Sequence, residues 1–429
     1  MVYCLSWLQC FWSDLPCQND IPEETMFDIL SLPDDITVDI LSRLPIETIV
    51  ACREVCWRWR SLTSTRQFSE IHSRRVGASS VLLLQYELPH ESHESTKGGD
   101  ERPVLYVEDF GTKLAEAREV CTRDYKRGGN SPEFLASCNG FLLLKLYNMS
   151  MYVICNPATL EGGLTLAWLP HHRVSIPGFF FDELTKEYML FISQGGKGFQ
   201  DTHYSIYNLN TKELNPLGKL RYAPDVSGIK PAVYVDGLLF LMVEHQYRDG
   251  RSHPHCSKSI MMVKVKKNAD YFTLLPHPGS RCGFISSQEK HANMRLSVET
   301  NGQLLFTEMH TKAIHGWVLK DIVKWLWEKI YVVDLDRFEF RSFLCFGDPF
   351  MYDYEPHFLG IQNGELVLHW PQRGVYLYNL QLKIVRRIRG SQLRKDSSAT
   401  SVYALSCAKT LASLSDLKAP STISGCCEY

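Results

Sequence analysis

The stretch LPDDITVDILSRLP, residues 32–45, decides how the N-terminal part of the chain folds. Pro33 suits the start of a helix, because the amide proton that it lacks would have no partner there. Asp34 and Asp35 then lie in the first turn, where negative charge stabilises the helix dipole. The apolar residues after them recur at helical spacing, and Pro45 stops the helix. This stretch therefore predicts a short amphipathic helix.

A second apolar helical segment is expected directly after Pro45, with Arg53 on its polar side. Its apolar face carries Ile46, Ile49, Val50, Cys52, Val55, Cys56, Trp59 and Leu62. Short helices within about 40 residues bury too little surface to be very stable alone. A module so rich in Leu, Ile and Trp gains from a partner, and apolar helix faces commonly dock into a partner's groove.

Three runs in this module closely resemble the F-box, a helical docking module. They are LPDD at residues 32–35, ILSRLP at residues 40–45 and VCWRWRSL at residues 55–62. The family pattern is Leu-Pro, then Ile-Leu-x-Arg-Leu-Pro, then Val-Cys, a polar pair and Trp-Arg-x-Leu. Trp57 stands where the family commonly has Lys, which leaves the apolar anchors unchanged.

The resemblance implies docking on a Skp-family adaptor, which in turn binds a cullin scaffold. The positions that match the family's contact pattern are Leu32, Pro33, Ile40, Leu41, Leu44, Pro45, Val55, Cys56, Trp59 and Leu62. Some apolar residues of the module are instead expected to hold the helices together, and we assign this role to Ile36, Ile49 and Val50. We expect direct contact for Leu32, Pro33 and Trp59.

Beyond the helices, the sequence changes to short apolar runs that each follow a turn. Asn-Gly and Asp-Gly supply the positive φ angles of tight hairpins. Such turns stand at Asn139-Gly140, Asp236-Gly237, Asn301-Gly302 and Asn363-Gly364, and an apolar strand follows each. Strands that repeat at roughly 40 to 50 residues are typical of a β-propeller. We expect about six blades, and closure of the ring by pairing of residues 81–86 with residues 402–405.

The sequence therefore predicts an α+β multidomain chain, with an N-terminal helical F-box followed by an all-β propeller. The expected divisions are a disordered extension over residues 1–26, the F-box over 27–75, a first strand and polar loop over 76–103, the propeller over 104–406 and a tail over 407–429.

The propeller resembles the kelch-like F-box-associated region of plant F-box proteins. The resembling runs are SCNG at 137–140, CNPAT at 155–159, FD at 181–182, WVL at 317–319 and NGEL at 363–366. The Gly-Gly doublet and the spaced Tyr and Trp of a strict kelch blade are missing.

Composition narrows the function classes. The formal net charge of -2 over 429 residues gives no general attraction to nucleic acid or to acidic lipid. No apolar run reaches the roughly 18 residues of a membrane span, so no membrane partner is expected. The 14 cysteines are scattered through apolar segments, as expected of free cysteines in a reducing compartment. We expect the cytoplasm or the nucleus.

We find no catalytic constellation in the sequence and expect no cofactor. His253, His255 and Cys256 lie close together, but no second ligand pair is in view, so we expect a surface loop and no metal. Polar or aromatic loops suited to target binding are His171–Arg173, Tyr247–Arg251, Arg281-Cys282 and Tyr352–Tyr354.

These features predict a non-catalytic substrate-recognition subunit of an SCF-type (Skp-cullin-F-box) ubiquitin ligase. The helices would bind the adaptor, and the propeller would hold a protein target. Two alternatives stay open. The first is a propeller that binds a small molecule or a glycan, with vestigial helices, and the second is an F-box scaffold outside any ligase.

Overall fold

The computed structural model describes most of the helical module and the strands that follow it. The described residues are 32–76, 80–87, 104–108, 116–119, 133–146, 151–159, 163–166, 174–195, 201–225, 230–246, 252–253, 256–265, 271–279, 291, 293–299, 301–310, 313–335, 357–362, 364–370, 374–388 and 401–417. The expected extension over residues 1–26 lies outside these ranges. No helix within them is long and apolar enough to cross a membrane.

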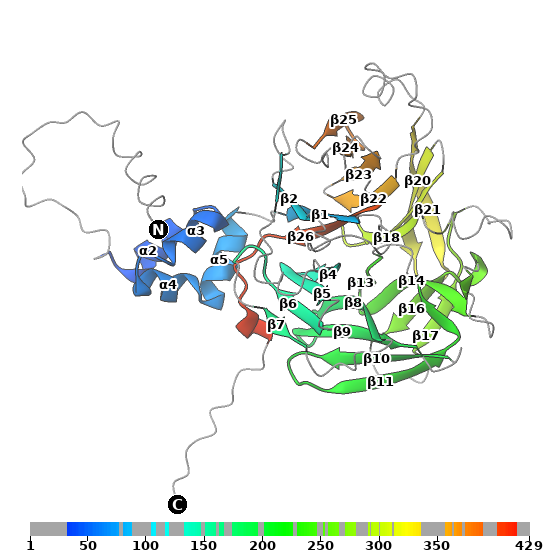
Figure 1. Ribbon diagram of the computed structural model, residues 1–429, viewed down its shortest axis with the longest axis horizontal. Coiled ribbons are helices and arrows are strands. Elements are labelled where there is room, and N and C mark those ends of the chain that lie inside the picture. The colour runs from blue at the N-terminus through cyan, green and yellow to red at the C-terminus, as the bar shows by residue number, and fades with distance from the viewer. Residues whose placement is uncertain are drawn as a thin grey trace, which may run out of the picture.

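Short helices form the N-terminal module, drawn in blue in Figure 1. They are α2 (Asp34–Leu41), α3 (Ile46–Cys52), α4 (Trp57–Thr63) and α5 (Arg66–Val76). The first helix begins after Pro33, as the sequence predicts. The second predicted segment is divided into α3 and α4, because Cys56 leaves the helical conformation and its sulfur accepts a hydrogen bond from the amide of Trp59.

A buried arginine holds these two helices together. Arg53 was expected on the polar side, but it is only 8% exposed. Its guanidinium donates a hydrogen bond to the carbonyl oxygen of Thr63, 2.9 Å away. Charged groups enter a core only where hydrogen bonds replace their lost hydration. Apolar periodicity cannot reveal such a partner, because Arg53 directly follows α3 whereas Thr63 ends α4.

Among the described residues, antiparallel strands form six sheets. The first three contain the strands between residues 80 and 220, and the last strand of the chain joins the first of them. The first sheet has the order β26 (Ser401–Ala408), β1 (Ser80–Glu87), β2 (Val104–Glu108) and β3 (Glu116–Glu119). The second contains β4 (Glu133–Cys138), β5 (Phe141–Leu146), β6 (Met151–Cys155) and β7 (Leu164–Thr165). The third contains β8 (Val174–Asp182), β9 (Glu187–Gln194), β10 (Thr202–Asn208) and β11 (Leu214–Leu220).

The other sheets follow in chain order. The fourth contains β12 (Tyr222–Pro224), β14 (Leu238–Gln246), β16 (Ile260–Lys264) and β17 (Phe272–Leu275), with β13 (Val233–Val235) and β15 (Ser252–His253) also paired to β14. The fifth contains β18 (Met294–Val298), β19 (Leu304–Met309), β20 (Ala313–Asp321) and β21 (Leu326–Asp334). The sixth contains β22 (His357–Gln362), β23 (Glu365–Trp370), β24 (Gly374–Asn379) and β25 (Ile384–Arg387).

The sheets form a closed propeller. Each innermost strand contacts the next, in the order β26, β4, β8, β13, β18 and β22, and β22 contacts β26 again. The ring closes because β1 pairs with β26, with Leu83 opposite Leu405. The predictions of about six units and of this closure are confirmed. The ring thus includes β1, which precedes the range 104–406 that the sequence suggested, and β26 extends two residues beyond that range.

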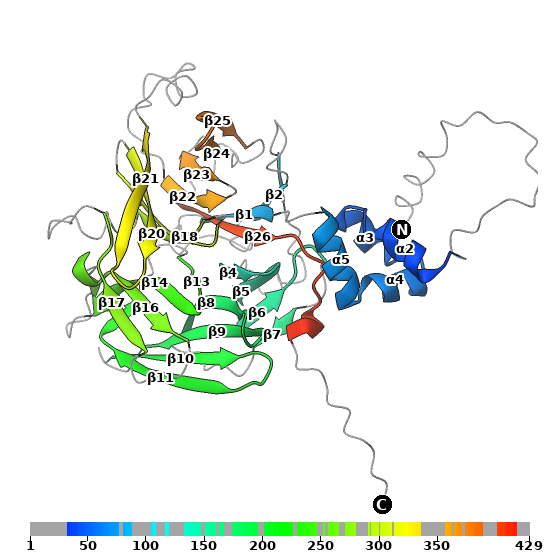
Figure 2. The same cartoon turned by 180° about the vertical axis from the view of Figure 1, so that it is seen from behind.

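Strand direction gives the propeller two different faces. In each antiparallel sheet, alternate turns lie at the same edge. The turn at Asn139-Gly140, with φ angles of 47° and 85°, therefore shares one face with the turn after β6. We call this the helix face, because the chain after β26 runs there to the helical module (Figures 1 and 2). Crossings between sheets lie on the opposite face, which we call the distal face.

The expected tail over residues 407–429 is partly built into the fold. β26 extends to Ala408, and a short 3-10 helix, η7, spans Leu414–Leu417. Leu417 is fully buried among side chains of the second and third sheets. The C-terminal segment therefore packs along the helix face as far as residue 417.

Candidate functional site

The helical module exposes several apolar side chains that its own core does not use. Ile36 and Ile40 lie one turn apart on α2 and are 44% and 41% exposed. Val55 lies between α3 and α4 and is 53% exposed. Trp57 is the first residue of α4 and is 81% exposed. We call these four residues the apolar patch. An exposed apolar group on a soluble protein commonly marks a partner's binding site.

Arg58 positions the two halves of this patch. Its guanidinium donates a hydrogen bond to the Asp34 carboxylate, 2.6 Å away, and another to the carbonyl oxygen of Leu32. These bonds fix the start of α2 against the start of α4. Ile36 and Trp57 are distant in the sequence, but these bonds hold their two helices in a fixed position relative to each other.

The ten residues predicted to contact an adaptor differ in burial. Pro33, Ile40, Pro45 and Val55 are exposed, whereas Leu32, Leu44, Cys56, Trp59 and Leu62 are half-buried. Leu41 is 2% exposed and lies in the core of the module, so its side chain is a packing residue in the free chain. Contact with an adaptor stays a prediction for all ten residues.

Two members of the apolar patch were not predicted as contact residues. Ile36 was assigned to packing between helices, but its exposure places it outside the core. Trp57 was noted only because it departs from the family pattern, and that departure was the one sequence signal for it. Of the residues assigned to packing, Ile49 is fully buried and Val50 packs against the same core.

The helical module and the propeller share a core. Leu411, which follows β26, is 3% exposed and packs with Leu41, Ile46, Ile49 and Phe68. The Lys409 ammonium group also pairs with the Glu47 carboxylate at 2.7 Å. Burial opposes ionisation of Glu47, but the hydrogen bond from Lys409 holds the pKa of that carboxyl below its usual value. The joint is therefore built from both packing and charge.

The side chain of Asn156 fixes the path of this C-terminal segment. Its amide nitrogen donates hydrogen bonds to the carbonyl oxygens of Thr410, at 3.0 Å, and of Ala412, at 2.8 Å. Its amide oxygen accepts a hydrogen bond from the backbone of Ala158. The Asn-Pro turn that we quoted for its resemblance to plant F-box proteins thus holds the joint between the two domains.

The centre of the ring contains a cavity of about 730 Å³, lined by the innermost strands of all six sheets. Lys230 and Arg295 contribute positive charge to its lining, and Glu183 and Glu299 contribute negative charge. The ammonium group of Lys230 forms a buried ion pair with Asp225. Burial first, and then the charge of Arg295, lower the pKa of Lys230 to about 8. The cavity combines apolar walls with charged groups of both signs.

Metal-ligating side chains gather in two places among the described residues. One group is Cys256, His277 and His291, and the other is Glu308, His310 and His315. The sequence placed Cys256 beside His253 and His255 and predicted a surface loop without metal there. Cys256 meets histidines from other segments, whereas His255 lies outside the described residues. The predicted target-binding loops at 171–173, 247–251, 281–282 and 352–354 also lie outside them.

Comparison with known proteins identifies the helical module. Residues 29–69 match the family model described as F-box-like. The N-terminal helices form an F-box-like domain. Its match spans the apolar patch and the buried core residues from α2 to α5, and it confirms the resemblance seen in the sequence.

Relatives with F-box names extend the comparison into the propeller. The chain is 32% identical over 191 residues to F-box protein At3g07870 of Arabidopsis thaliana, which covers 41% of this chain and 40% of that protein. It is 26% identical to F-box protein At1g67130 of the same plant, covering 70% of this chain and 60% of that protein. The chain thus spans less than two thirds of the length of these two relatives.

A solved structure of a nidogen/laminin complex is similar over 77% of this chain and 99% of that chain, with 9% identity and a TM-score of 0.41.

Proposed function

We propose that this chain is a substrate-recognition subunit of an SCF-type ubiquitin ligase. The F-box-like domain and the F-box relatives support a substrate-recognition role in general. In the proposed complex, the helices bind a Skp-family adaptor and, through it, a cullin. The propeller binds a protein target, and the transfer chemistry belongs to partner enzymes. The chain itself acts as an adaptor rather than as a catalyst.

The observation that carries this proposal is the apolar patch on the segment that matches the F-box model. Its four side chains are between 41% and 81% exposed, although the module has a buried core of its own. Large apolar side chains in such a position bind strongly once a partner excludes water from them. The patch therefore supplies the kind of surface that an adaptor's groove requires.

The distal face is the proposed target-binding face. The F-box-like domain and the C-terminal segment occupy the helix face, where Leu411 and Lys409 join the two domains. A target bound on the distal face would meet neither of them. Two reactants that are bound to one complex have a large effective concentration for each other. A target bound to the propeller and an enzyme docked on the same complex are therefore sufficient for ubiquitin transfer.

The proposed compartment is the cytoplasm or the nucleus. The described cysteines form no disulfide: they are Cys52, Cys56, Cys138, Cys155, Cys256 and Cys407. Free thiols in this number suit a reducing compartment, where disulfides rarely persist.

Binding of a purified Skp-family adaptor tests the proposal directly. The double variant Ile40→Asp with Trp57→Ala changes exposed residues only, so the module keeps its buried core. Loss of a buried tryptophan contact costs about 2–4 kcal/mol, which corresponds to a roughly 30- to 1,000-fold weaker adaptor complex. Leu184→Asp is the matched control, because Leu184 is 66% exposed but lies on the propeller.

The expected result is adaptor binding by the wild type and by the Leu184 variant, with binding lost in the double variant. Circular dichroism confirms that each variant is folded. Failure of the wild-type chain to bind any Skp-family adaptor would overturn the proposal. Equal binding by the double variant would place the adaptor on another surface.

A further inference from the structure

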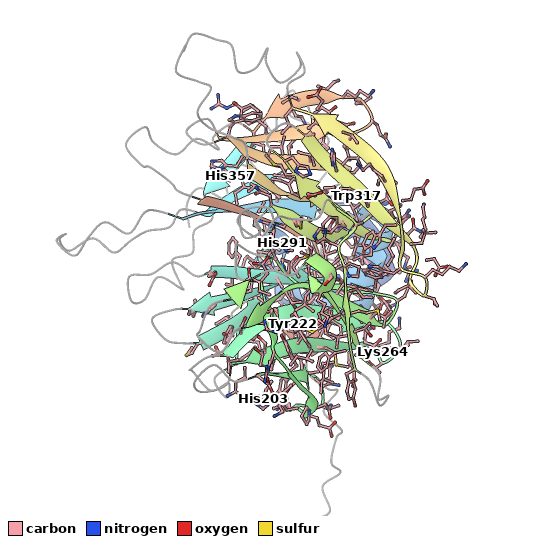
Figure 3. All side chains as sticks on the ribbon, turned by 90° about the vertical axis from the view of Figure 1, so that its right-hand side faces the viewer. His203, Tyr222, Lys264, His291, Trp317 and His357 are labelled. Atoms are coloured by element: carbon pink, nitrogen blue, oxygen red, sulfur yellow. The ribbon has the colours of Figure 1, made fainter. Side chains whose placement is uncertain are left out.

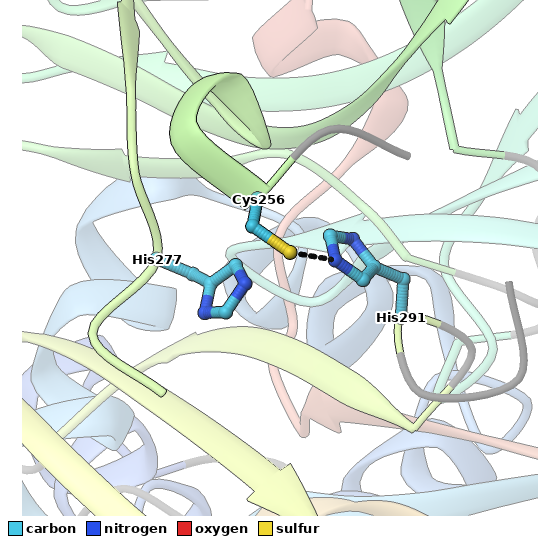
Figure 4. A group of neighbouring side chains, drawn as sticks. All are labelled: Cys256, His277 and His291. Carbon is cyan, nitrogen blue, oxygen red and sulfur yellow. Dashed lines mark hydrogen bonds between the residues drawn. The ribbon is translucent and has the colours of Figure 1, made fainter. Parts of the chain in front are cut away.

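Three segments of the chain bring Cys256, His277 and His291 together on the distal face (Figure 4). Cys256 begins the short 3-10 helix η5 (Cys256–Lys258), which leads into β16. His277 follows β17, the outer strand of the fourth sheet, and His291 precedes β18, the innermost strand of the fifth. Figure 3 views the propeller from the side away from the helices and labels His291 near the middle. The group therefore lies where the chain crosses between two sheets.

The distances within this group fit one metal ion. The possible ligand atoms all lie within 4.8 Å of one another. The sulfur of Cys256 is 3.5 Å from Nε2 of His291. Zinc binds sulfur at about 2.3 Å and imidazole nitrogen at about 2.0–2.1 Å, so a tetrahedral site separates S and N ligands by about 3.6 Å. The separation of these two atoms matches that value without rearrangement.

His277 is the second observation that points to a ligand. It is only 7% exposed, and both of its ring nitrogens are buried with no hydrogen-bond partner among the described residues. Its ring stacks on Phe306 at 5.8 Å and meets the His291 ring edge-on at 5.1 Å. Buried polar atoms nearly always have a partner, and such an exception calls for an explanation. A metal ion bound to one nitrogen provides it.

We propose that Cys256, His277 and His291 bind a zinc ion that fastens the fourth sheet to the fifth. One thiolate and two imidazoles suit zinc, whereas hard cations such as calcium and magnesium prefer oxygen ligands. Three protein ligands leave the fourth tetrahedral position to water. The ion stabilises the crossing between β17 and β18, whose two sheets share no strand pairing among the described residues.

Metal content of the full-length chain tests the site. The purified protein is loaded with zinc, desalted over a chelating resin and assayed by inductively coupled plasma mass spectrometry. We expect about one retained zinc per chain in the wild type and a loss of most of it in Cys256→Ser and in His291→Gln. Two variants away from the site, Cys138→Ser and His203→Gln, serve as controls and retain the metal.

Cobalt substitution identifies the ligands independently of affinity. Tetrahedral Co(II) bound by a thiolate gives intense visible bands and a sulfur-to-metal charge-transfer band. Cys256→Ser should remove the charge-transfer band, and His203→Gln should leave it unchanged. Hydrogen exchange locates the effect, because removal of the metal should increase exchange in residues 256–264 and 271–279 and not in the F-box-like domain.

Several results would overturn this proposal. One is a wild-type chain that retains no zinc after loading, although circular dichroism shows it to be folded. Another is metal that persists in both site variants and is lost in His315→Gln, which would place it in the neighbouring Glu308 group. A cobalt complex without a thiolate band would exclude Cys256 as a ligand.

Discussion

Replacement of Leu411 by Ala tests whether the C-terminal segment completes the core of the F-box-like domain. Leu411 is 3% exposed, and its neighbours Leu41, Ile46 and Ile49 belong to helices that precede it by more than 350 residues. The substitution keeps the backbone and removes most of the side chain from this cluster. It leaves every hydrogen bond of Asn156 in place, because those bonds reach main-chain oxygens of Thr410 and Ala412.

The expected cost follows from the burial of Leu411. Leu→Ala in a packed core costs about 2–5 kcal/mol, and the cost is greatest where the surroundings cannot close the cavity. Leu411 lies at a joint between two domains, where the helices can partly move inward. We therefore expect the free energy of unfolding of the helical domain to fall by about 2–4 kcal/mol.

Hydrogen exchange measured by mass spectrometry separates this domain from the propeller. A loss of that size lowers the protection of amides in α3 by roughly 30- to 1,000-fold. Amides in strands β9 and β23, remote from the joint, should keep their protection. The control is Leu382→Ala, at a residue that is 69% exposed, and it should change stability by less than about 0.5 kcal/mol.

Unchanged protection of α3 in the Leu411 variant would refute the shared core. Equal loss of protection in α3 and in the remote strands would also refute the reasoning, because it would mean that the chain unfolds as one unit from this position. A third variant, Lys409→Met, distinguishes packing from charge. It should have a smaller effect, since Glu47 is more than half exposed and such ion pairs contribute little.

Two other predictions concern the propeller. His369 is 3% exposed, and burial, followed by the charge of His357, lowers its pKa to about 4 from a usual value of 6.5. The unfolded chain therefore binds more protons between these values, so up to about 3 kcal/mol of stability present above pH 6.5 is lost as the pH falls to 4. Chemical denaturation at several pH values should show a smaller loss in His369→Phe than in the wild type, because other buried histidines such as His291 keep their own contribution, and parallel curves would contradict it. For Gly316→Ala, the new methyl group would lie 2.1 Å from the ring of Tyr331. We expect a loss of about 1–3 kcal/mol, measured by thermal unfolding, and an unchanged melting temperature would show that the ring moves aside without cost.

The propeller could be predicted from the sequence because its signals are local. Asn139 and Asp236 have φ angles of 47° and 50°, which are the values that an Asn-Gly or Asp-Gly turn leads one to expect. Each such turn determines a hairpin without reference to the rest of the chain. The pairing of β1 with β26 was also predictable, because a ring of sheets closes when its first and last apolar runs pair and leave no strand edge open.

The parts that could not be predicted depend on contacts between distant segments. The pattern of apolar residues placed Leu41 on a helix face, but it could not show that Leu411 covers that face. The sequence near Cys256 offered only its neighbours His253 and His255, and with no second ligand pair it predicted a surface loop without metal. His277 and His291 are 21 and 35 residues further along the chain, on either side of a crossing between sheets, and no spacing rule connects them.

The joint between the two domains constrains the proposed role in ubiquitin transfer. α5 ends at Val76 and β1 begins at Ser80, so residues 77–79 alone connect the helices to the first sheet. β26 is paired with β1, and it leads directly to Lys409 and Leu411 in the F-box-like domain. Residues 77–79 and the segment after β26 therefore both connect the helices to the first sheet, next to the core that Leu411 shares with the F-box-like domain. A joint of this kind sets the distance between the apolar patch and the distal face, and an effective concentration depends on that distance. If the proposed role is correct, a loosened joint should reduce the rate of target modification while adaptor binding and target binding, measured separately, stay unchanged.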